Sequence, residues 1–282
     1  MRVHRHHSAE LRFELAFAAP TPALAGVVRQ YAGWIDWSTV QRGLREVPSG
    51  DVPLVILFQG KTDCRDVFTS GLHDSATIVK SDGPTAGVQA TLTALGARLF
   101  FNQPLSEFTN RTLGLEDVIG APARRLQAEL HDAPTWEARF AILDRVIASR
   151  VAASRSPSRE LTWSWEELTR TAGRVKIAAL VDEVGWSERH FAHEFRHQLG
   201  MTPKAFARVL RFARVVKQLT MRGQPRLVDI ALDCGYYDQA HFTRDFRTFA
   251  GITPTELLAS RGPDESGFLP EPPSVPKTPP DR

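Results

Sequence analysis

Residues 227–254, LVDIALDCGYYDQAHFTRDFRTFAGITP, decide the fold of the C-terminal part of this chain because they repeat an earlier segment. The earlier copy is residues 177–203, IAALVDEVGWSERHFAHEFRHQLGMTP, and the two align when one residue is inserted after the aromatic that follows the glycine. Beyond that gap each position has its counterpart 51 residues later, so that His190, Phe191, Phe195, Arg196, Gly200, Thr202 and Pro203 match His241, Phe242, Phe246, Arg247, Gly251, Thr253 and Pro254. The repeat predicts two copies of one supersecondary unit.

Each copy has the punctuation of two helices joined by a short turn. A first helix ends at a glycine, Gly185 or Gly235, where the chain turns sharply. Ser187 or Asp238 then provides an N-cap for the second helix, which stops at another glycine before a Thr-Pro pair that starts the next helix. Helix, glycine turn and helix together predict a helix-turn-helix unit.

The two second helices are predicted to be amphipathic. At 100° per residue, one side carries the apolar residues Phe191, Phe195 and Leu199 in the first copy and Phe242, Phe246 and Phe249 in the second. The other side carries polar and basic residues: Arg189, His190, His193, Arg196 and His197, then Ala240, His241, Arg244, Arg247 and Thr248. A helix that is anchored by aromatic residues and projects donors suits the major groove of DNA.

A basic helix, Pro203 to about Arg222, is expected to connect the two units. Between Trp186 and Arg222 eight Lys and Arg residues stand against two acidic ones, a local excess that favours an anionic partner. Lys204, Arg208 and Arg211 fall close to one face of this helix, where they could meet phosphates and fix the register on DNA.

The region 158–260 resembles the DNA-binding domain of AraC/XylS transcription regulators, most closely in IALDCGYYDQAHFTRDFRTFAGITP, residues 230–254. The resemblance implies that the two second helices enter successive segments of the major groove of double-stranded DNA, about one helical turn apart. Carried over by position, the base contacts would come from Arg189, Ala192, His193, Gln239, Ala240, His241, Thr243 and Arg244. Phosphate contacts are expected from Arg196, Lys204, Arg208, Arg211 and Arg247.

The N-terminal half is expected to be α+β and rich in strands. Residues 47–59, VPSGDVPLVILFQ, have a turn signal followed by a buried-strand run, and Ala86 to Phe101 mixes β-branched and apolar residues with glycines, which predicts further β structure. After Gly120 the spacing becomes helical and is broken at Pro134, which predicts two helices that close the domain. We therefore expect a sensing or dimerisation domain over residues 1–152, a linker over 153–159, an all-α DNA-binding domain over 160–261 and a disordered Pro-rich tail over 262–282.

Segments 45–58, 87–101 and 115–120 are similar to the N-terminal portions of a subgroup of the same regulators. By analogy this domain would be a cupin-like or related β-rich sensor of a small-molecule effector, with Thr135 to Arg150 as a helix available for homodimerisation. RNA polymerase is the further partner that the resemblance implies. The residues leave a second hypothesis open, in which the domain only oligomerises or binds a protein partner. They identify no ligand-binding residue.

A zinc metalloprotease is the sharpest rival, because HEFRH, residues 193–197, matches H-E-x-x-H. Arg196 puts a charge beside the proposed ligands, no suitable third ligand follows, and His193 and His197 correspond to Arg244 and Thr248 in the other copy. The repeat thus keeps polar outward positions but not metal ligands. We expect neither catalytic activity nor a metal or cofactor.

Composition favours a cytoplasmic protein. The longest apolar run, Pro53 to Phe58, is too short to cross a bilayer, and Cys64 and Cys234 are too few for a disulfide framework. Prolines 20 and 22 interrupt any signal-peptide core, so we expect a cytoplasmic protein without a membrane span. His4, His6 and His7 are expected in a flexible terminus.

Overall fold

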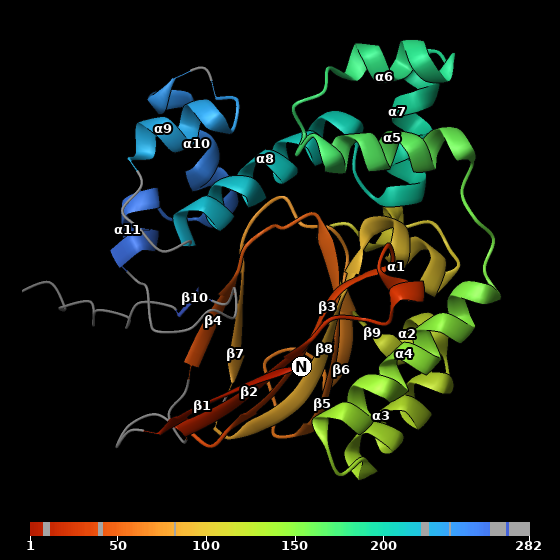
Figure 1. Ribbon diagram of the computed structural model, residues 1–282, viewed down its shortest axis with the longest axis vertical. Helices are drawn as coiled ribbons and strands as arrows, with labels where there is room; N and C mark the ends of the chain where they lie inside the picture. The colour runs from red at the N-terminus through yellow and green to blue at the C-terminus, as the bar shows by residue number, and fades with distance from the viewer. Residues whose placement is uncertain are drawn as a thin grey trace, which may run out of the picture.

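The computed structural model describes residues 1–7, 12–38, 42–81, 83–220, 226–236, 238–259 and 269–270. It has a β-rich N-terminal part and an all-helical C-terminal part (Figure 1). The expected fold class is confirmed: an α+β domain precedes an all-α domain in which two helix pairs are joined by a long helix. Of the expected Pro-rich tail, only Leu269 and Pro270 fall within the described residues.

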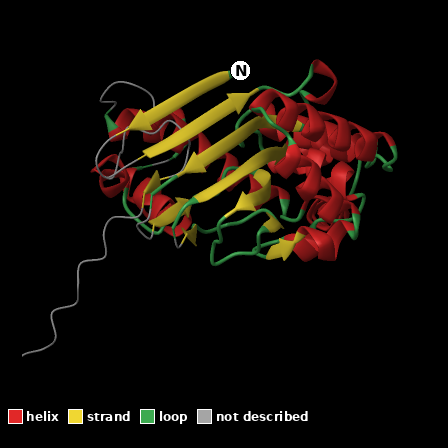
Figure 2. Ribbon diagram, turned by 90° about the horizontal axis from the view of Figure 1, so that it is seen from below, coloured by secondary structure: helices red, strands yellow, loops and turns green. Residues whose placement is uncertain are grey.

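Two antiparallel sheets build the N-terminal part. The larger has the strand order β1-β2-β3-β8-β5-β6-β9, and the smaller has the order β10-β4-β7. The first sheet consists of β1 (Arg2–His7), β2 (Arg12–Ala18), β3 (Val28–Asp36), β8 (Thr85–Thr93), β5 (Asp51–Gln59), β6 (Val67–Ser70) and β9 (Thr112–Gly114). The second consists of β10 (Leu269–Pro270), β4 (Arg42–Glu46) and β7 (Thr77–Ser81). Seen from below, the strands lie side by side with helices flanking them (Figure 2).

The buried run predicted before Gln59 is strand β5. Val52, Leu54 and Ile56 are fully buried there, because β5 is a central strand that pairs with both β8 and β6. The turn signal before it is also present, since Gly50 has a φ of 82°, in the left-handed region. This part of the sequence therefore folds as its local pattern predicts.

Among its described residues, the N-terminal part also contains four helices and two short 3-10 turns. They are η1 (Pro22–Leu24), α1 (Ala94–Phe101), η2 (Ser106–Phe108), α2 (Leu115–Ile119), α3 (Pro122–Asp132) and α4 (Trp136–Ala152). Helices α3 and α4 are the two predicted after Gly120. The prediction of β structure through Phe101 was wrong in its second half: Thr93 ends β8 and caps α1, its Oγ1 accepting a hydrogen bond from the Gly96 N–H at 2.8 Å.

The N-terminal histidines also differ from expectation. His4, His6 and His7 belong to β1, which pairs along its whole length with β2. The ring of His6 stacks on Phe13 and the ring of His4 lies edge-on to Phe17. Cross-strand pairing therefore holds this segment in the sheet.

Helix α4 packs on strand β3 with its apolar side. Gly33 leaves room for the Trp136 ring, which a Cβ at that position would approach to 2.4 Å. Tyr31 stacks on Phe140 and donates its hydroxyl to Asp144 Oδ1 at 2.8 Å. The helix expected to be available for dimerisation thus packs its large apolar residues inside its own domain, and its other side exposes polar residues and alanines.

The C-terminal part contains α5 (Arg159–Arg170), α6 (Ile177–Val184), α7 (Glu188–Leu199), α8 (Pro203–Thr220), α9 (Leu227–Asp233), α10 (Gln239–Ala250) and α11 (Pro254–Ala259). Helices α6 and α7 form the first unit and α9 and α10 form the second, and Figure 1 shows α8 running between them. The 51-residue repeat is therefore a structural repeat. Among the residues described, no helix has the length and apolar character needed to cross a membrane.

Candidate nucleic-acid interface and ligand cavity

The two second helices, α7 and α10, start and end with the same local chemistry. Ser187 accepts a hydrogen bond from the His190 N–H at 3.3 Å, and Asp238 accepts one from the His241 N–H at 2.7 Å. Gly200 and Gly251 end the helices with φ of 93° and 71°, where a side chain would be strained. These caps fix both helices at the same positions of the repeat.

Phenylalanines anchor both helices to α8. Phe195 packs on Phe206 with ring centroids 5.8 Å apart, and Phe246 packs on Phe212 at 5.2 Å. The predicted apolar residues are all buried: Phe191, Phe195, Leu199, Phe242, Phe246 and Phe249. The long helix therefore receives one unit at each end, and the opposite sides of α7 and α10 are left for solvent or a partner.

The exposed side of α7 carries three of its predicted contact residues, Arg189, His193 and Arg196, while Ala192 is half-buried. Trp186 holds the ring of the neighbouring His190, with centroids 4.7 Å apart. Long donors therefore project freely from the first two turns of this helix.

The exposed side of α10 carries Gln239, Ala240, Arg244 and Arg247. These four, with Thr243 and Thr248, surround a shallow hollow on the protein surface. His241 is half-buried, because its ring lies against Tyr236 and its Nε2 is 3.8 Å from Asp245 Oδ2. Of the five base contacts predicted in this unit, His241 is thus the one turned toward the protein.

The predicted phosphate contacts separate into two groups. Arg196, Lys204 and Arg247 are exposed. Arg208 Nη2 donates to Asp245 Oδ1 at 2.9 Å, and Arg211 Nη1 donates to the Gly173 carbonyl at 3.0 Å. These two arginines join α8 to its neighbours within the domain, a role that residue spacing did not reveal.

The HEFRH segment has the spacing of a zinc motif but not its surroundings. His193 and His197 lie parallel on the exposed side of α7, with ring centroids 6.1 Å apart, and Phe195 between them is buried in the core. Within the described ranges, no group of three His, Cys, Asp or Glu side chains is placed to hold a metal ion. The residues of this helix are therefore better explained by its correspondence to α10 than by the zinc motif.

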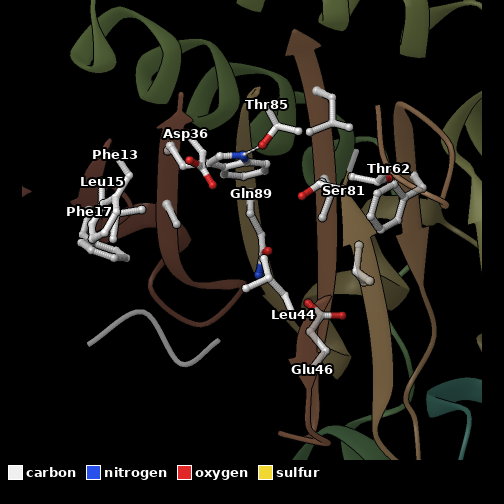
Figure 3. A pocket seen from close by; sticks show the side chains of 17 residues that line it. Phe13, Leu15, Phe17, Asp36, Leu44, Glu46, Thr62, Ser81, Thr85 and Gln89 are labelled. Carbon is white, nitrogen blue, oxygen red and sulfur yellow. Dashed lines mark hydrogen bonds between the residues drawn. The ribbon is translucent and has the colours of Figure 1, made fainter. Parts of the chain in front are cut away.

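A cavity of about 140 Å³ lies between the two sheets of the N-terminal part. Phe13, Trp34 and Phe68 come to it from the larger sheet, and Leu44, Glu46 and Val79 come from the smaller one. Figure 3 shows Asp36, Gln89 and Glu46 among the side chains around this space. The lining is mainly apolar, with a few polar groups, as is usual for a small-molecule site.

Glu46 also lines a second hollow, of about 340 Å³, which separates the N-terminal part from α8. Ala213, Val216 and Lys217 form the α8 side of that hollow. Burial raises the pKa of Glu46 to about 7. This carboxyl group therefore lies between the cavity and the helix that carries both helix-turn-helix units.

Arg45 and Thr109 are functional candidates that sequence reasoning missed. Arg45 Nη1 donates to the carbonyl of Ala250, the last residue of α10, at 3.1 Å. Thr109 Oγ1 donates to the carbonyl of Gly200, directly after α7, at 2.5 Å. Both second helices are thus held at their C-terminal ends by the N-terminal part. The resemblance of residues 45–58 pointed to this segment without assigning a role to Arg45.

Known proteins match the two parts separately. A helix-turn-helix domain family matches residues 180–260, and a domain of unknown function (DUF6597) matches residues 16–114. Among solved structures, ToxT from Vibrio cholerae O395 is 12% identical with a TM-score of 0.44, covering 78% of this chain and 96% of ToxT. The unsaturated fatty acid-bound form of ToxT is also 12% identical with a TM-score of 0.44, covering 90% and 97%.

Curated relatives match the helical part. Uncharacterized HTH-type regulators from Staphylococcus aureus, such as SAS0078, are 31% identical over 87 residues, which is 31% of this chain but only 12% of their own length. The activator RhaR from Klebsiella pneumoniae is 28% identical over 124 residues, 44% of this chain and 37% of RhaR. The probable transcription factor PqrA from Proteus vulgaris is 30% identical over 111 residues, 39% of this chain and 84% of PqrA. With the doubled helix-turn-helix unit, these matches show that the chain belongs to the AraC/XylS family of transcription regulators.

Proposed function

We propose that the protein binds a specific double-stranded DNA sequence through α7 and α10 and regulates transcription under the control of a small molecule in the N-terminal cavity. The observation that carries this proposal is the pair of capped, aromatic-anchored helices whose outer sides carry exposed Arg, His and Gln side chains. Such side chains can pair with base edges in the major groove, where each base pair presents its own pattern of donors and acceptors.

Base reading is assigned to Arg189 and His193 in α7 and to Gln239, Thr243 and Arg244 in α10. Arg244 is exposed and can make the bidentate contact to guanine O6 and N7. Ala192 and Ala240 offer only an apolar contact, such as one with a thymine methyl group. His241 would first have to turn away from Tyr236, so its contribution is the smallest of the predicted set.

Phosphate binding is assigned to the exposed cations Arg196, Lys204 and Arg247. Arg208 and Arg211 are given a scaffold role first, since each donates a hydrogen bond within the domain, to Asp245 and to the Gly173 carbonyl, and each keeps further N–H groups for the phosphate contact predicted for it. RNA polymerase and a second copy of the chain remain the expected protein partners. Residues 1–152, the linker 153–159 and residues 160–261 keep the sensing, connecting and DNA-binding roles predicted for them.

The cavity favours ligand sensing over a purely oligomerising N-terminal domain. Strand β4 supplies a route for control, because successive residues of a strand point to opposite faces. Leu44 and Glu46 line the cavity, and Arg45 between them reaches the end of α10. A ligand that moves β4 would therefore move the support of the second unit.

Selection of bound sequences from a random DNA pool, with the full chain at physiological salt, tests the DNA-binding proposal. We expect enrichment of two short blocks about one helical turn apart. The matched variant Arg244→Ala should lose preference at one base pair, whereas Lys204→Ala should weaken all sequences alike and reduce the salt slope by about one unit. A pool without enrichment would contradict sequence-specific binding.

A thermal-shift screen of the full chain against small metabolites, followed by DNA binding with each stabilising compound, tests ligand control. A compound that binds the native state raises the melting temperature by mass action. If no compound did so, and the chain's oligomeric state alone changed its DNA affinity, the oligomerising alternative would replace ligand sensing.

A further inference from the structure

Glu46 places a carboxyl group, without a partner among the described residues, in a mainly apolar cavity. Its strand position is opposite Thr77, and its side chain lines the cavity between the sheets as well as the hollow beside α8. Within the part of the chain that the structure describes, no hydrogen bond or ion pair involves its carboxylate. In Figure 3 the Glu46 side chain lies at one end of the cavity lining, with Gln89 between it and Asp36 in this view. An ionised carboxylate in such surroundings is costly unless a cation or donor meets it.

Among the described residues, the cavity lining contains two carboxyl groups and no basic side chain. None of the lining residues that the structure describes is a Lys, Arg or His. Asp36 is partly satisfied, because its Oδ1 accepts a hydrogen bond from the Ser38 N–H at 2.8 Å. Phe13, Phe17 and Trp34 add aromatic rings, whose faces attract cations. The described part of the lining therefore offers carboxylates and aromatic rings, which suit a cation better than an anion.

We propose that the cavity binds a small amine, with an apolar or aromatic body between the sheets and a protonated nitrogen held by the Glu46 carboxylate. This inference rests on the proposed function, because it names the ligand class for the proposed sensing site. A carboxylate or phosphate ligand would place a second negative charge beside Glu46 and Asp36. A neutral ligand would fill the apolar space and leave Glu46 unpaired.

Other charged groups around Glu46 do not replace such a ligand. Asp51, His73 and Lys217 line the second hollow with it, and Asp51 is already paired with Arg29 Nε at 3.3 Å. Burial, together with the nearby carboxylates of Asp63 and Glu46, raises the pKa of the Cys64 thiol to about 11, so the thiol stays protonated at neutral pH. In the described residues, neither His73 nor Lys217 forms an ion pair with Glu46.

Three probes with one apolar body test the ligand class: 3-phenylpropylamine, 3-phenylpropanol and 3-phenylpropionate, each titrated calorimetrically into the full chain. We expect the amine to bind about tenfold more tightly than the alcohol, and the propionate to bind most weakly. Because burial raises the pKa of Glu46 to about 7, amine binding should strengthen between about pH 6 and about pH 8, a range in which an alkylamine remains protonated.

Two variants assign the binding group. Glu46→Gln removes the charge with little change in shape and should lower the amine affinity about tenfold while sparing the alcohol. Asp36→Asn is the matched control at the other carboxyl group and should have the smaller effect. Three results would overturn the proposal: a loss of amine affinity in Asp36→Asn, equal binding of amine and propionate, or no amine binding up to about 10 mM. A Kd above about 10 mM means that the binding free energy is weaker than about −2.7 kcal/mol.

DNA binding by the same samples separates this inference from the proposed function. If the alcohol or the propionate bound in the cavity and changed DNA affinity, ligand control would stand and the amine assignment would fail. If no probe bound and DNA selection succeeded, the amine assignment alone would fail. If DNA selection failed while the amine bound, the regulatory role would be the part that is wrong.

Discussion

The two helix-turn-helix units share their caps and their aromatic packing on α8, but they differ in their hydrogen bonds to the N-terminal part. The first is joined to it by several hydrogen bonds: Arg98 Nε donates to Gln198 Oε1 at 2.7 Å, the Leu105 N–H donates to the Gln198 carbonyl at 3.2 Å, and Thr109 meets Gly200. The second is reached, among the described residues, by the Arg45 guanidinium at Ala250. The first unit is therefore joined to the N-terminal part by more of the described hydrogen bonds, and the second is joined through Arg45, whose strand β4 lines the cavity.

The largest expected effect tests the internal likeness of the units. Phe195→Ala and Phe246→Ala each remove a buried anchor from the same position of the repeat, and each should lower the free energy of unfolding by about 3 to 5 kcal/mol. Urea denaturation monitored by circular dichroism measures this loss. A cost confined to one variant would show that the units do not share one packing scheme.

The pH dependence of stability tests Glu46, the residue of strand β4 whose carboxyl group lines the cavity. Burial raises the pKa of Glu46 from 4.5 to about 7, so the folded state holds this proton where the unfolded state has lost it. The free energy of unfolding should therefore fall as pH rises from about 4.5 to about 7, by at most about 3 kcal/mol. Burial also raises the pKa of Asp51 to about 6, although the charge of Arg29 opposes this shift, so Asp51 contributes a pH dependence of the same sign.

Denaturant titrations of the wild type and Glu46→Gln across this range separate the two groups. The glutamine variant should lose most of the slope and keep the part that Asp51 supplies. An unchanged slope in Glu46→Gln would show that Glu46 titrates at its ordinary pKa.

Matched substitutions on the outer sides sharpen the comparison at the level of DNA. Arg244→Ala should cost about 1 to 3 kcal/mol of binding and relax the preference at one base pair. His193→Ala, its counterpart in the first unit, removes a shorter and singly pairing side chain and should cost less. Binding of a panel of single-base operator variants measures both, and a larger cost for His193→Ala would reverse the assignment of the dominant reader.

The smallest expected effect concerns the two hydrogen bonds that join the N-terminal part to the ends of α7 and α10. Arg45→Met and Thr109→Val each remove one hydrogen bond to the end of a second helix, and each should change stability by about 1 kcal/mol. Only Arg45→Met should abolish the effect of a cavity ligand on DNA affinity, because Arg45 belongs to the strand that lines the cavity. Equal loss of ligand response in both variants would contradict a separate route to the second unit.

Sequence predicted the helical half well because its information is local. Caps, glycine stops and aromatic spacing all lie within a few residues of one another, and both copies of the repeat contain them. The N-terminal half was harder for a physical reason. Thr93 is β-branched and ends a strand, yet it also caps α1, so the change from strand to helix lies inside one apolar run.

The cavity could not be found from spacing. Its lining comes from seven strands between Phe13 and Gln89, brought together by the pairing of distant segments. The hydrogen bonds of Arg208 and Arg211 could not be found from spacing either. Their helical position predicts phosphate contacts, which stay a prediction, but it does not reveal the bonds to Asp245 and Gly173, which are far away in sequence.

The tandem repeat has a consequence for the symmetry of the DNA site. Two units in one chain follow each other head to tail, whereas two subunits of a dimer are related by a two-fold axis. Their outer residues also differ, with Arg189 against Ala240 and His193 against Arg244. A site read by α7 and α10 therefore has a direction, and a single copy of the protein is enough to distinguish the two orientations of that site along the duplex.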